Sequence, residues 1–195
     1  MFILKIIVIP VLVGLSMFTT SQEVEPESKE GAFAIDSVHS TAIFSVHHLG
    51  AGMFYGRFND VSGTIELAEG LPAFSVSIAI DSIDTNNTRL DGHLKSPDFF
   101  NALEFPEMLF VSSSAKKIGD EKYEVVGKIT MHGVTKPLTV TMAKTGQVTN
   151  KRGEMLGFET TFTLMRSDFE MTYGIESGSL SDNIKVIVAL EAGRK

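Results

Sequence analysis

Residues 74–100 read FSVSIAID followed by SIDTNNTRLDGHLKSPDFF. In the first part, apolar residues from Phe74 to Ile80 alternate with small or polar ones, which is the period-two pattern of a half-buried β-strand. The second part is polar, ends in two adjacent phenylalanines and is far longer than the roughly 2 to 5 residues that join neighbouring antiparallel strands. Because loops of this length usually carry function, the pattern predicts a β-barrel with a lid.

The same period of two dominates the chain from Ala32 onward, and polar, glycine-containing turns separate the alternating segments. The predicted strands lie at about residues 32–37, 41–48, 55–67, 73–81, 106–115, 121–132, 135–146 and 155–166, with a ninth candidate at 183–192. Helical periodicity is nearly absent outside the insertion. We therefore predict an all-β fold, an extended eight-stranded antiparallel β-barrel, because closing the sheet removes its exposed edges.

The interior of an eight-stranded barrel can be filled by its own side chains or can hold one small ligand. The chain contains 14 Phe and 9 Met but no Trp. Met adapts to irregular apolar partners and Phe supplies a large apolar surface, which suits a ligand cavity. Both residues are also ordinary core residues, so composition alone leaves the two outcomes open.

The insertion near residues 82–103 contains two helix signals. Asn87 or Thr88 can cap a helical turn that places Leu90 and Leu94 on one face. The same turn places Arg89 and His93 together on another face.

A second short helix is predicted from Pro97 to about Leu103. Ser96 is a good N-cap, and proline at the first helical position loses no hydrogen bond. We expect the apolar residues of the insertion to cover the barrel mouth, and the alternative is that they plug the barrel as fixed core. These residues are Leu90, Leu94, Phe99 and Phe100.

The N-terminal segment has the pattern of a secretory signal peptide. Residues 1–21 hold a single charge, Lys5, and an apolar stretch from Ile6 to Phe18. The alternative is a retained membrane anchor, for which about 20 apolar residues are usual. Residues 22–31 contain four Glu and predict a flexible acidic linker before one domain at 32–195. We expect an exported protein of the periplasm, with an extracellular or membrane-anchored location as the alternative.

Composition excludes several classes of function. There is no cysteine, so disulfides and thiolate metal sites are absent, and the fold must rest on its apolar core. The formal net charge of −7 repels phosphate backbones, and no basic patch with interleaved aromatic residues is present. We expect no binding of nucleic acid.

No catalytic motif is recognisable. The sequence lacks a nucleophile elbow, a zinc-protease helix, a Walker loop and a dinucleotide-binding fingerprint. His47 and His48 are adjacent on a predicted strand, where consecutive side chains point to opposite faces and cannot easily share one ion. We therefore predict no catalytic residue, no metal site and no cofactor other than a bound lipid. A hydrolytic enzyme, a metal carrier and an envelope stress or protein-interaction module are the alternatives.

An ordered set of positions over residues 33–191 carries a family resemblance. The positions are Phe33, Ile35, Asp36, His39, Ser40, Phe44, Val46, His48, Leu49, Gly50, Gly56, Phe58, Gly63, the string 82–100, the run 105–110, Gly127, the run 133–137, the run 166–169 and the run 183–191. This set is similar to the YceI family of exported lipocalin-like proteins. Two departures are that Phe33 stands where the family usually has Trp, and that Leu90 replaces the usual Arg before Asp91.

The resemblance implies a periplasmic, often homodimeric barrel whose long apolar pore binds an amphiphile. The implied ligand is a polyisoprenoid, an isoprenoid quinone or its precursor, or a fatty acid or amide. Such a protein would carry, store or sense its ligand in the cell envelope. The membrane would then serve only as a source of lipid, or as an anchorage if the N-terminus is retained.

The expected ligand contacts fall into two groups. Apolar residues of the pore and lid should hold the chain: Phe44, Val46, Phe58, Phe74, Val76, Ile78, Ile80, Leu94, Phe99, Phe100, Phe110, Ile129, Met131, Leu138, Val140, Met142, Phe162 and Leu164. An apolar wall measures length but scarcely identifies chemistry, so polar groups at the end of the pore should select the head group. The candidates are His39, His48, Arg89, His93, Arg166 and Asp168, and for each the alternative is a purely structural role.

Overall fold

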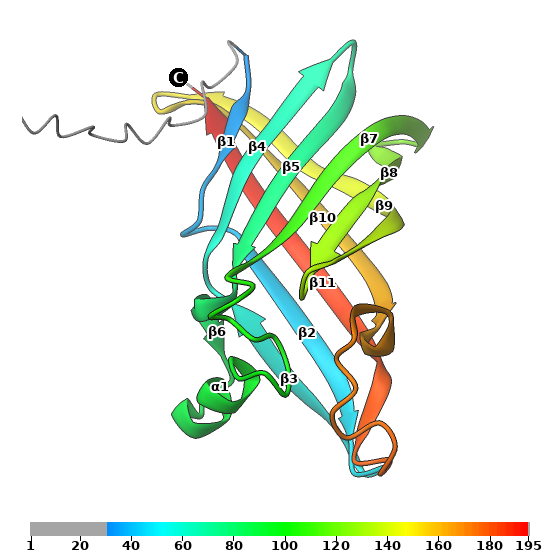
Figure 1. Cartoon of the computed structure of the whole chain (residues 1–195). Coiled ribbons are helices and arrows are strands. Elements are labelled where there is room, and N and C mark those ends of the chain that lie inside the picture. Colours follow the sequence, from blue (N-terminus) through cyan, green and yellow to red (C-terminus); the bar gives the residue numbers. More distant parts are fainter. Residues whose placement is uncertain (1–30, 195) are drawn as a thin grey trace, which may run out of the picture.

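The computed structural model describes residues 31–194, and within them eleven strands form one antiparallel sheet (Figure 1). Eight of these strands close into a ring because the last strand pairs back with the first. In ring order they are β1 (Phe33–Ile35), β4 (Val61–Ala68), β5 (Leu71–Ala79), β7 (Glu107–Gly119), β8 (Lys122–Met131), β9 (Val134–Asn150), β10 (Gly153–Met165) and β11 (Leu180–Arg194). The prediction of an eight-stranded antiparallel β-barrel is confirmed, but the ninth candidate at 183–192 is ring strand β11, and the strand predicted at 41–48 lies outside the ring.

Three further strands extend one side of the barrel beyond the ring. β2 (Thr41–His48) pairs with β11, β3 (Gly52–Phe58) pairs with β2, and the short β6 (Ile83–Asp84) pairs with β3. The turn between β2 and β3 lies at the bottom of Figure 1, and we call this end of the molecule the lower end. The barrel is therefore elongated.

The single strand predicted at 55–67 is wrong, because the chain bends at Asn59 and Asp60 and forms β3 and β4 instead. At the bend, the backbone N–H of Asn59 donates to the carbonyl of Ser82, and the carbonyl of Asp60 accepts from Ala79. The segment that the bend contacts is a 3₁₀ turn, η1 (Ile80–Ser82). This turn ends β5 earlier than the sequence pattern predicts. Two neighbouring segments thus bend together.

The insertion after β6 contains the first predicted helix, α1 (Thr88–Leu94), which lies at the lower left of Figure 1. The side chain of Asn87 caps it by accepting a hydrogen bond from the backbone N–H of Leu90 at 3.1 Å. Asp91 fixes the approach to the helix, because its carboxylate accepts hydrogen bonds from the N–H and hydroxyl of Thr85. The lid segment is thus held by specific polar contacts.

The second predicted helix, from Pro97 to Leu103, is wrong, since these residues form consecutive turns. The N–H groups of Phe100 and Ala102 donate back to Leu94 and Lys95 at the end of α1, and so do not build a new helical ladder. The hydroxyl of Ser96 donates to the carbonyl of His93 at 2.7 Å, so the expected cap is used to close α1.

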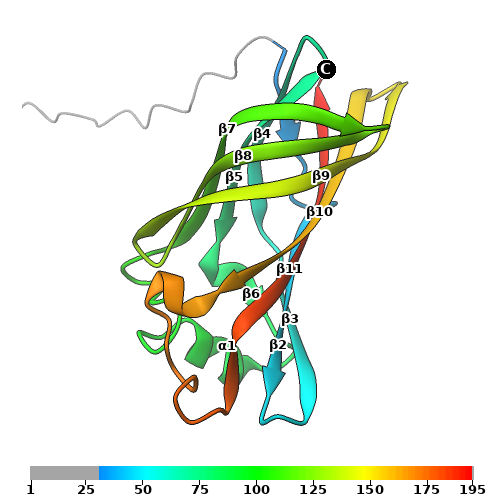
Figure 2. The same ribbon diagram turned by 90° about the vertical axis from the view of Figure 1, so that its right-hand side faces the viewer.

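The wall opens between β9 and β10 toward the lower end. These strands pair from Asn150 and Gly153 down to Met142 and Thr160, and below that point they separate, as Figure 2 shows. A second 3₁₀ turn, η2 (Arg166–Phe169), lies in the gap and is tied to the β8–β9 turn by a hydrogen bond between His132 Nδ1 and the carbonyl of Phe169 at 2.9 Å. Residues 170–179, which we call the lower loop, continue from it to β11.

The half of the barrel away from the lower end, which we call the upper half, is filled by large side chains. Phe74 packs edge-on against Phe158 with ring centroids 5.1 Å apart, and Tyr123 packs against the same ring at 6.2 Å. Phe33 is fully buried beneath the guanidinium of Arg194, which lies 4.4 Å from the ring centroid. This half of the interior is solid core.

Candidate functional site

The lower half of the barrel contains a cavity of about 560 Å³. Its volume lies within the roughly 300–1,000 Å³ typical of small-molecule sites. Its wall is formed by inward-facing residues of β2, β3, β5, β7, β8, β9, β10 and β11, and the insertion closes one side. The space that the sequence left undecided is therefore open in one half of the barrel and filled in the other.

Most of the apolar residues predicted to hold a ligand chain lie in this wall. They are Phe44, Val46, Phe58, Val76, Ile78, Leu94, Phe99, Phe100, Phe110, Ile129, Met131, Leu138, Val140, Met142, Phe162 and Leu164. Within each strand, these residues share one parity, because alternate side chains of a β-strand point to the same face. The lid residues reach the cavity because α1 buries Leu94 and the following turns bury Phe99.

Two of the predicted apolar residues lie outside the cavity wall. Phe74 is 2% exposed but sits in the solid upper core, above the level at which the cavity begins. Ile80 falls in the η1 turn instead of the strand, and its backbone N–H donates to the carbonyl of Pro106. Both side chains are ordinary core.

Polar side chains in the wall gather at the lower end. The polar lining residues are His48, His93, Thr160, Arg166, Tyr173 and Ser179. His48 lies opposite Leu180 in the sheet, and Ser179 precedes that residue, so both stand beside the lower loop. Thr160 is the exception, because its hydroxyl lies higher in the barrel and donates to the carbonyl of Thr141 at 2.9 Å. The cavity thus has an apolar body and one polar end.

Three rings close this polar end between the insertion and the lower loop. His93 of α1 packs edge-on against both Phe99 and Tyr173 at 5.1 Å, and Phe99 lies 5.0 Å from Tyr173. His93 Nε2 is also 3.0 Å from the carboxylate of Asp98. These contacts join two segments far apart in sequence directly over the cavity.

Arg166 shapes the lower wall from within. It is 5% exposed, and its guanidinium donates to the carbonyls of Met171, Tyr173 and Ser181 at 2.9–3.2 Å. Burial lowers the pKa of Arg166, and the charge of Asp182 opposes that shift. The side chain therefore pins the lower loop to the barrel while facing the cavity.

The YceI-like domain family model matches residues 33–192 of this chain. This chain belongs to the YceI-like family. It is 36% identical over 189 residues to the UPF0312 protein YE1254 of Yersinia enterocolitica, covering 93% of this chain and 94% of that protein. Among solved structures, the YceI protein of Campylobacter jejuni matches with a TM-score of 0.69 and 27% identity over 93% of this chain and 99% of that one.

A polyisoprenoid binding domain from Saccharophagus degradans shares the fold of this YceI-like chain. The TM-score is 0.69 at 14% identity, over 85% of this chain and all of that domain. At this identity the likeness concerns the fold alone.

The remaining polar candidates of this YceI-like domain lie away from the cavity wall. Arg89 does not line the cavity but lines a separate surface depression with Asn87, Leu90 and His93. Asp168 is exposed in η2. His39 lies at the seam where β1 and β2 meet β11, far along the chain from the lower loop.

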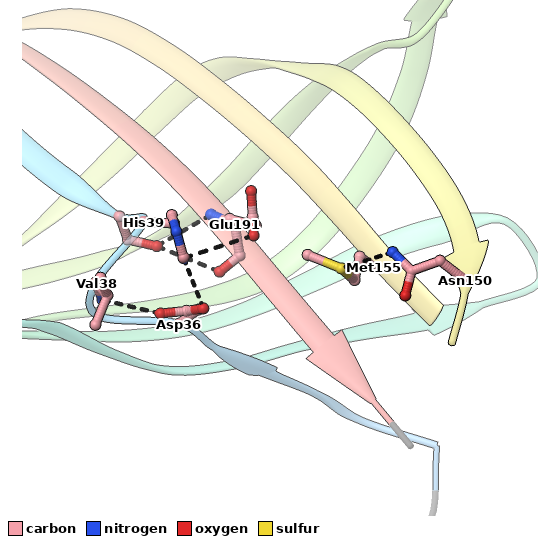
Figure 3. Close-up of polar contacts among 7 residues, drawn as sticks. Asp36, Val38, His39, Asn150, Met155 and Glu191 are labelled. Carbon is pink, nitrogen blue, oxygen red and sulfur yellow. Dashed lines mark hydrogen bonds and ion pairs between the residues drawn. The ribbon is translucent and has the colours of Figure 1, made fainter. Parts of the chain in front are cut away.

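His39 belongs to a polar cluster with Asp36 and Glu191 at this seam (Figure 3). Nδ1 of His39 is 2.9 Å from Oδ2 of Asp36 and 3.8 Å from Oε1 of Glu191. The Ser40 hydroxyl accepts from the backbone N–H of Glu191 at 3.0 Å. The cluster therefore fastens the turn between β1 and β2 to the closing strand.

The His39 contact predicts a pH-dependent stability. Its hydrogen bond to Asp36 raises the pKa of His39 above 6.5 and lowers the pKa of Asp36 below 3.8. The histidine's contribution is complete below 6.5 and is lost as pH rises through its raised pKa, while the Asp36 contribution is lost as pH falls through its lowered pKa. We expect the urea midpoint of the wild type, relative to His39→Asn, to fall as pH rises from 6.5 through the raised pKa of His39. Parallel pH profiles of the two proteins would contradict this.

Sequence reasoning missed part of the wall. β11 contributes Ile184, Val186, Val188 and Leu190, whose alternation is visible in the sequence and could have identified them. Met171 and Tyr173 come from the lower loop, which has no periodic pattern, so no sequence signal marked them. Of the adjacent histidines, His48 lines the cavity and His47 does not.

Within residues 31–194 no helix is long and apolar enough to cross a bilayer. The signal peptide and most of the acidic linker predicted from the sequence lie outside the described residues.

Proposed function

We propose that this protein binds one long apolar amphiphile in the lower cavity, with the chain in the barrel and the polar head at the lower loop. The observation that carries the proposal is the cavity of about 560 Å³ with an apolar body and a polar lower end. The proposed ligand is a polyisoprenoid, an isoprenoid quinone or its precursor, or a fatty acid or amide. The polyisoprenoid-binding description of the Saccharophagus degradans domain, which has the same fold, supports this class.

Burial of the chain supplies the affinity. Each buried CH₂ contributes about 0.8 kcal/mol, so a few isoprene units outweigh the cost of ordering the ligand. Met108, Met131, Met142 and Met171 in the wall adapt to irregular chains, because their side chains are unbranched and flexible. The hydrogen bonds of Arg166 also agree with a binding role. They hold backbone carbonyls of the lower wall in place, so this side chain has a structural task.

The biological setting follows from the same proposal. The ligand would be carried, stored or sensed in the cell envelope, after export directed by the N-terminal segment. A periplasmic location and a homodimer belong to this proposal and rest on the family resemblance.

The first test is extraction of the protein purified from its native envelope. Organic solvent should release a stoichiometric apolar compound that mass spectrometry detects. Native preparations that repeatedly release nothing, and that also fail to take up geranylgeraniol or palmitic acid, would overturn the proposal.

Single tryptophans provide a second test, because the natural chain contains none. Phe162→Trp places the reporter in the cavity wall, and Tyr55→Trp places a matched one on the outer face of β3, where Tyr55 is 60% exposed. Addition of apolar chains should change the emission of the first reporter only. The bulkier ring should also weaken binding of long chains more than short ones, and equal weakening at all lengths would point to a general folding defect.

A further inference from the structure

One cavity-lining ring rests directly on a glycine. Phe44 of β2 lies opposite Gly56 of β3 in the sheet. A Cβ atom placed on Gly56 would lie 2.7 Å from Cε1 of the Phe44 ring, closer than real Cβ contacts allow, and 3.1 Å from Cε2, which is tighter than most of them. The backbone of Gly56 is not in the left-handed region, so glycine serves here to leave room for the ring.

A second ring rests on a glycine elsewhere in the wall, although there the two residues are not direct partners in the sheet. The ring of Phe110 lies where a Cβ of Gly127 would stand, at 2.7 Å from its Cζ atom. There the carbonyl oxygen of Val111 would also be too close, so Gly127 is constrained by backbone as well. At Gly56 the nearest atoms all belong to the Phe44 side chain, so a substitution there tests the contact with the ring alone.

Phe58 limits where a displaced Phe44 ring can move. Its neighbour Phe58, at 5.8 Å, is 3% exposed and is itself packed edge-on against Phe100 of the insertion at 5.5 Å. The free space beside Phe44 is the cavity that it lines. A side chain at position 56 would therefore push the ring inward and narrow the cavity.

We propose that Gly56 and Phe44 together set the bore of the cavity and so determine which chains it accepts. With the ring drawn back onto the glycine, the bore admits a methyl-branched chain, whose cross-section is larger than that of a straight alkyl chain. This inference rests on the proposed binding of an apolar amphiphile and specifies its class. Gly56 and Phe44 are specificity-determining residues for branched chains.

The test compares phytanic acid with palmitic acid, which share a carboxyl head and main-chain length and differ in the methyl branches. Gly56→Ala should weaken binding of phytanic acid about tenfold or more, which corresponds to the lost burial of about two methyl groups. Palmitic acid should lose less than about threefold. Isothermal titration of the wild type and the variant with each acid measures both effects.

A second substitution distinguishes a narrowed cavity from a folding defect. Phe44→Leu shortens the displaced side chain, so Gly56→Ala combined with Phe44→Leu should recover binding of phytanic acid. Loss that is equal for both acids, or that the double variant does not recover, would overturn the proposal while leaving amphiphile binding intact. A wild type that binds neither acid would instead overturn the proposed function, and with it the proposed role of Gly56 and Phe44.

A ligand-free measurement checks the displacement itself. In NMR spectra of the wild type, the Phe44 ring protons should show contacts to the Gly56 α-protons. In Gly56→Ala these should be replaced by contacts to cavity-lining residues of the facing strands β7 and β8, such as Phe110 or Ile129. Unchanged ring contacts in the variant would overturn the proposed role of Gly56.

Discussion

Replacing Phe74 with alanine is expected to lower the free energy of unfolding by about 3–5 kcal/mol, the usual cost of removing a buried phenylalanine. Phe74 is 2% exposed, and its ring packs against Phe158 at 5.1 Å in the upper half of the barrel. The neighbouring side chains fill this region, so alanine would leave a new void. Urea unfolding followed by circular dichroism measures the loss.

Phe162→Ala is the matched control, because Phe162 is inward-facing, half-buried and borders a cavity that already exists. Its ring has fewer packing partners to lose, and we expect a cost of about 1–2 kcal/mol. Amphiphile binding should show the opposite order, with a larger loss in Phe162→Ala than in Phe74→Ala. Equal destabilisation by the two substitutions would contradict the division of the barrel into a solid half and a hollow half.

Replacing Arg166 with methionine is expected to destabilise the protein by about 3 kcal/mol and to loosen the lower loop. The substitution keeps an apolar stem but leaves the carbonyls of Met171, Tyr173 and Ser181 without their donors. A buried acceptor that loses its partner costs about 1–3 kcal/mol, and partial access of water reduces the sum. Urea unfolding and amide hydrogen exchange in residues 170–181 provide the measurements.

Arg166→Lys separates charge from geometry. Lysine retains the positive charge, but a single ammonium cannot reach three carbonyls that a planar guanidinium spans. We expect it to recover less than half of the lost stability and to leave exchange in the lower loop fast. Full recovery by lysine would show that charge alone, without the hydrogen-bond geometry, accounts for the role of Arg166.

Local patterns were sufficient for much of the fold. The alternation from Phe158 to Leu164 is a property of neighbouring residues, and it predicted both the strand and the side that faces inward. Asn87 likewise marked the start of α1 because capping depends on the next few residues only. Where a partner distant in sequence decides, the pattern failed: Asn59 and Asp60 break a strand because they bond to residues 79–82. Ser96 is a different case, because its partner is local: its hydroxyl donates to the carbonyl of His93 and closes α1, which the capping pattern did not distinguish from the start of a second helix.

The sequence by itself determined that the chain is a barrel of alternating strands with a capped helical insertion, since side-chain direction and capping are local properties. Only the tertiary structure decided where the barrel is hollow. Phe74 and Phe162 have the same inward parity, yet one lies in solid core and the other borders the cavity. The difference depends on which rings meet across the barrel and on where β9 separates from β10, and both follow from contacts between residues far apart in the chain.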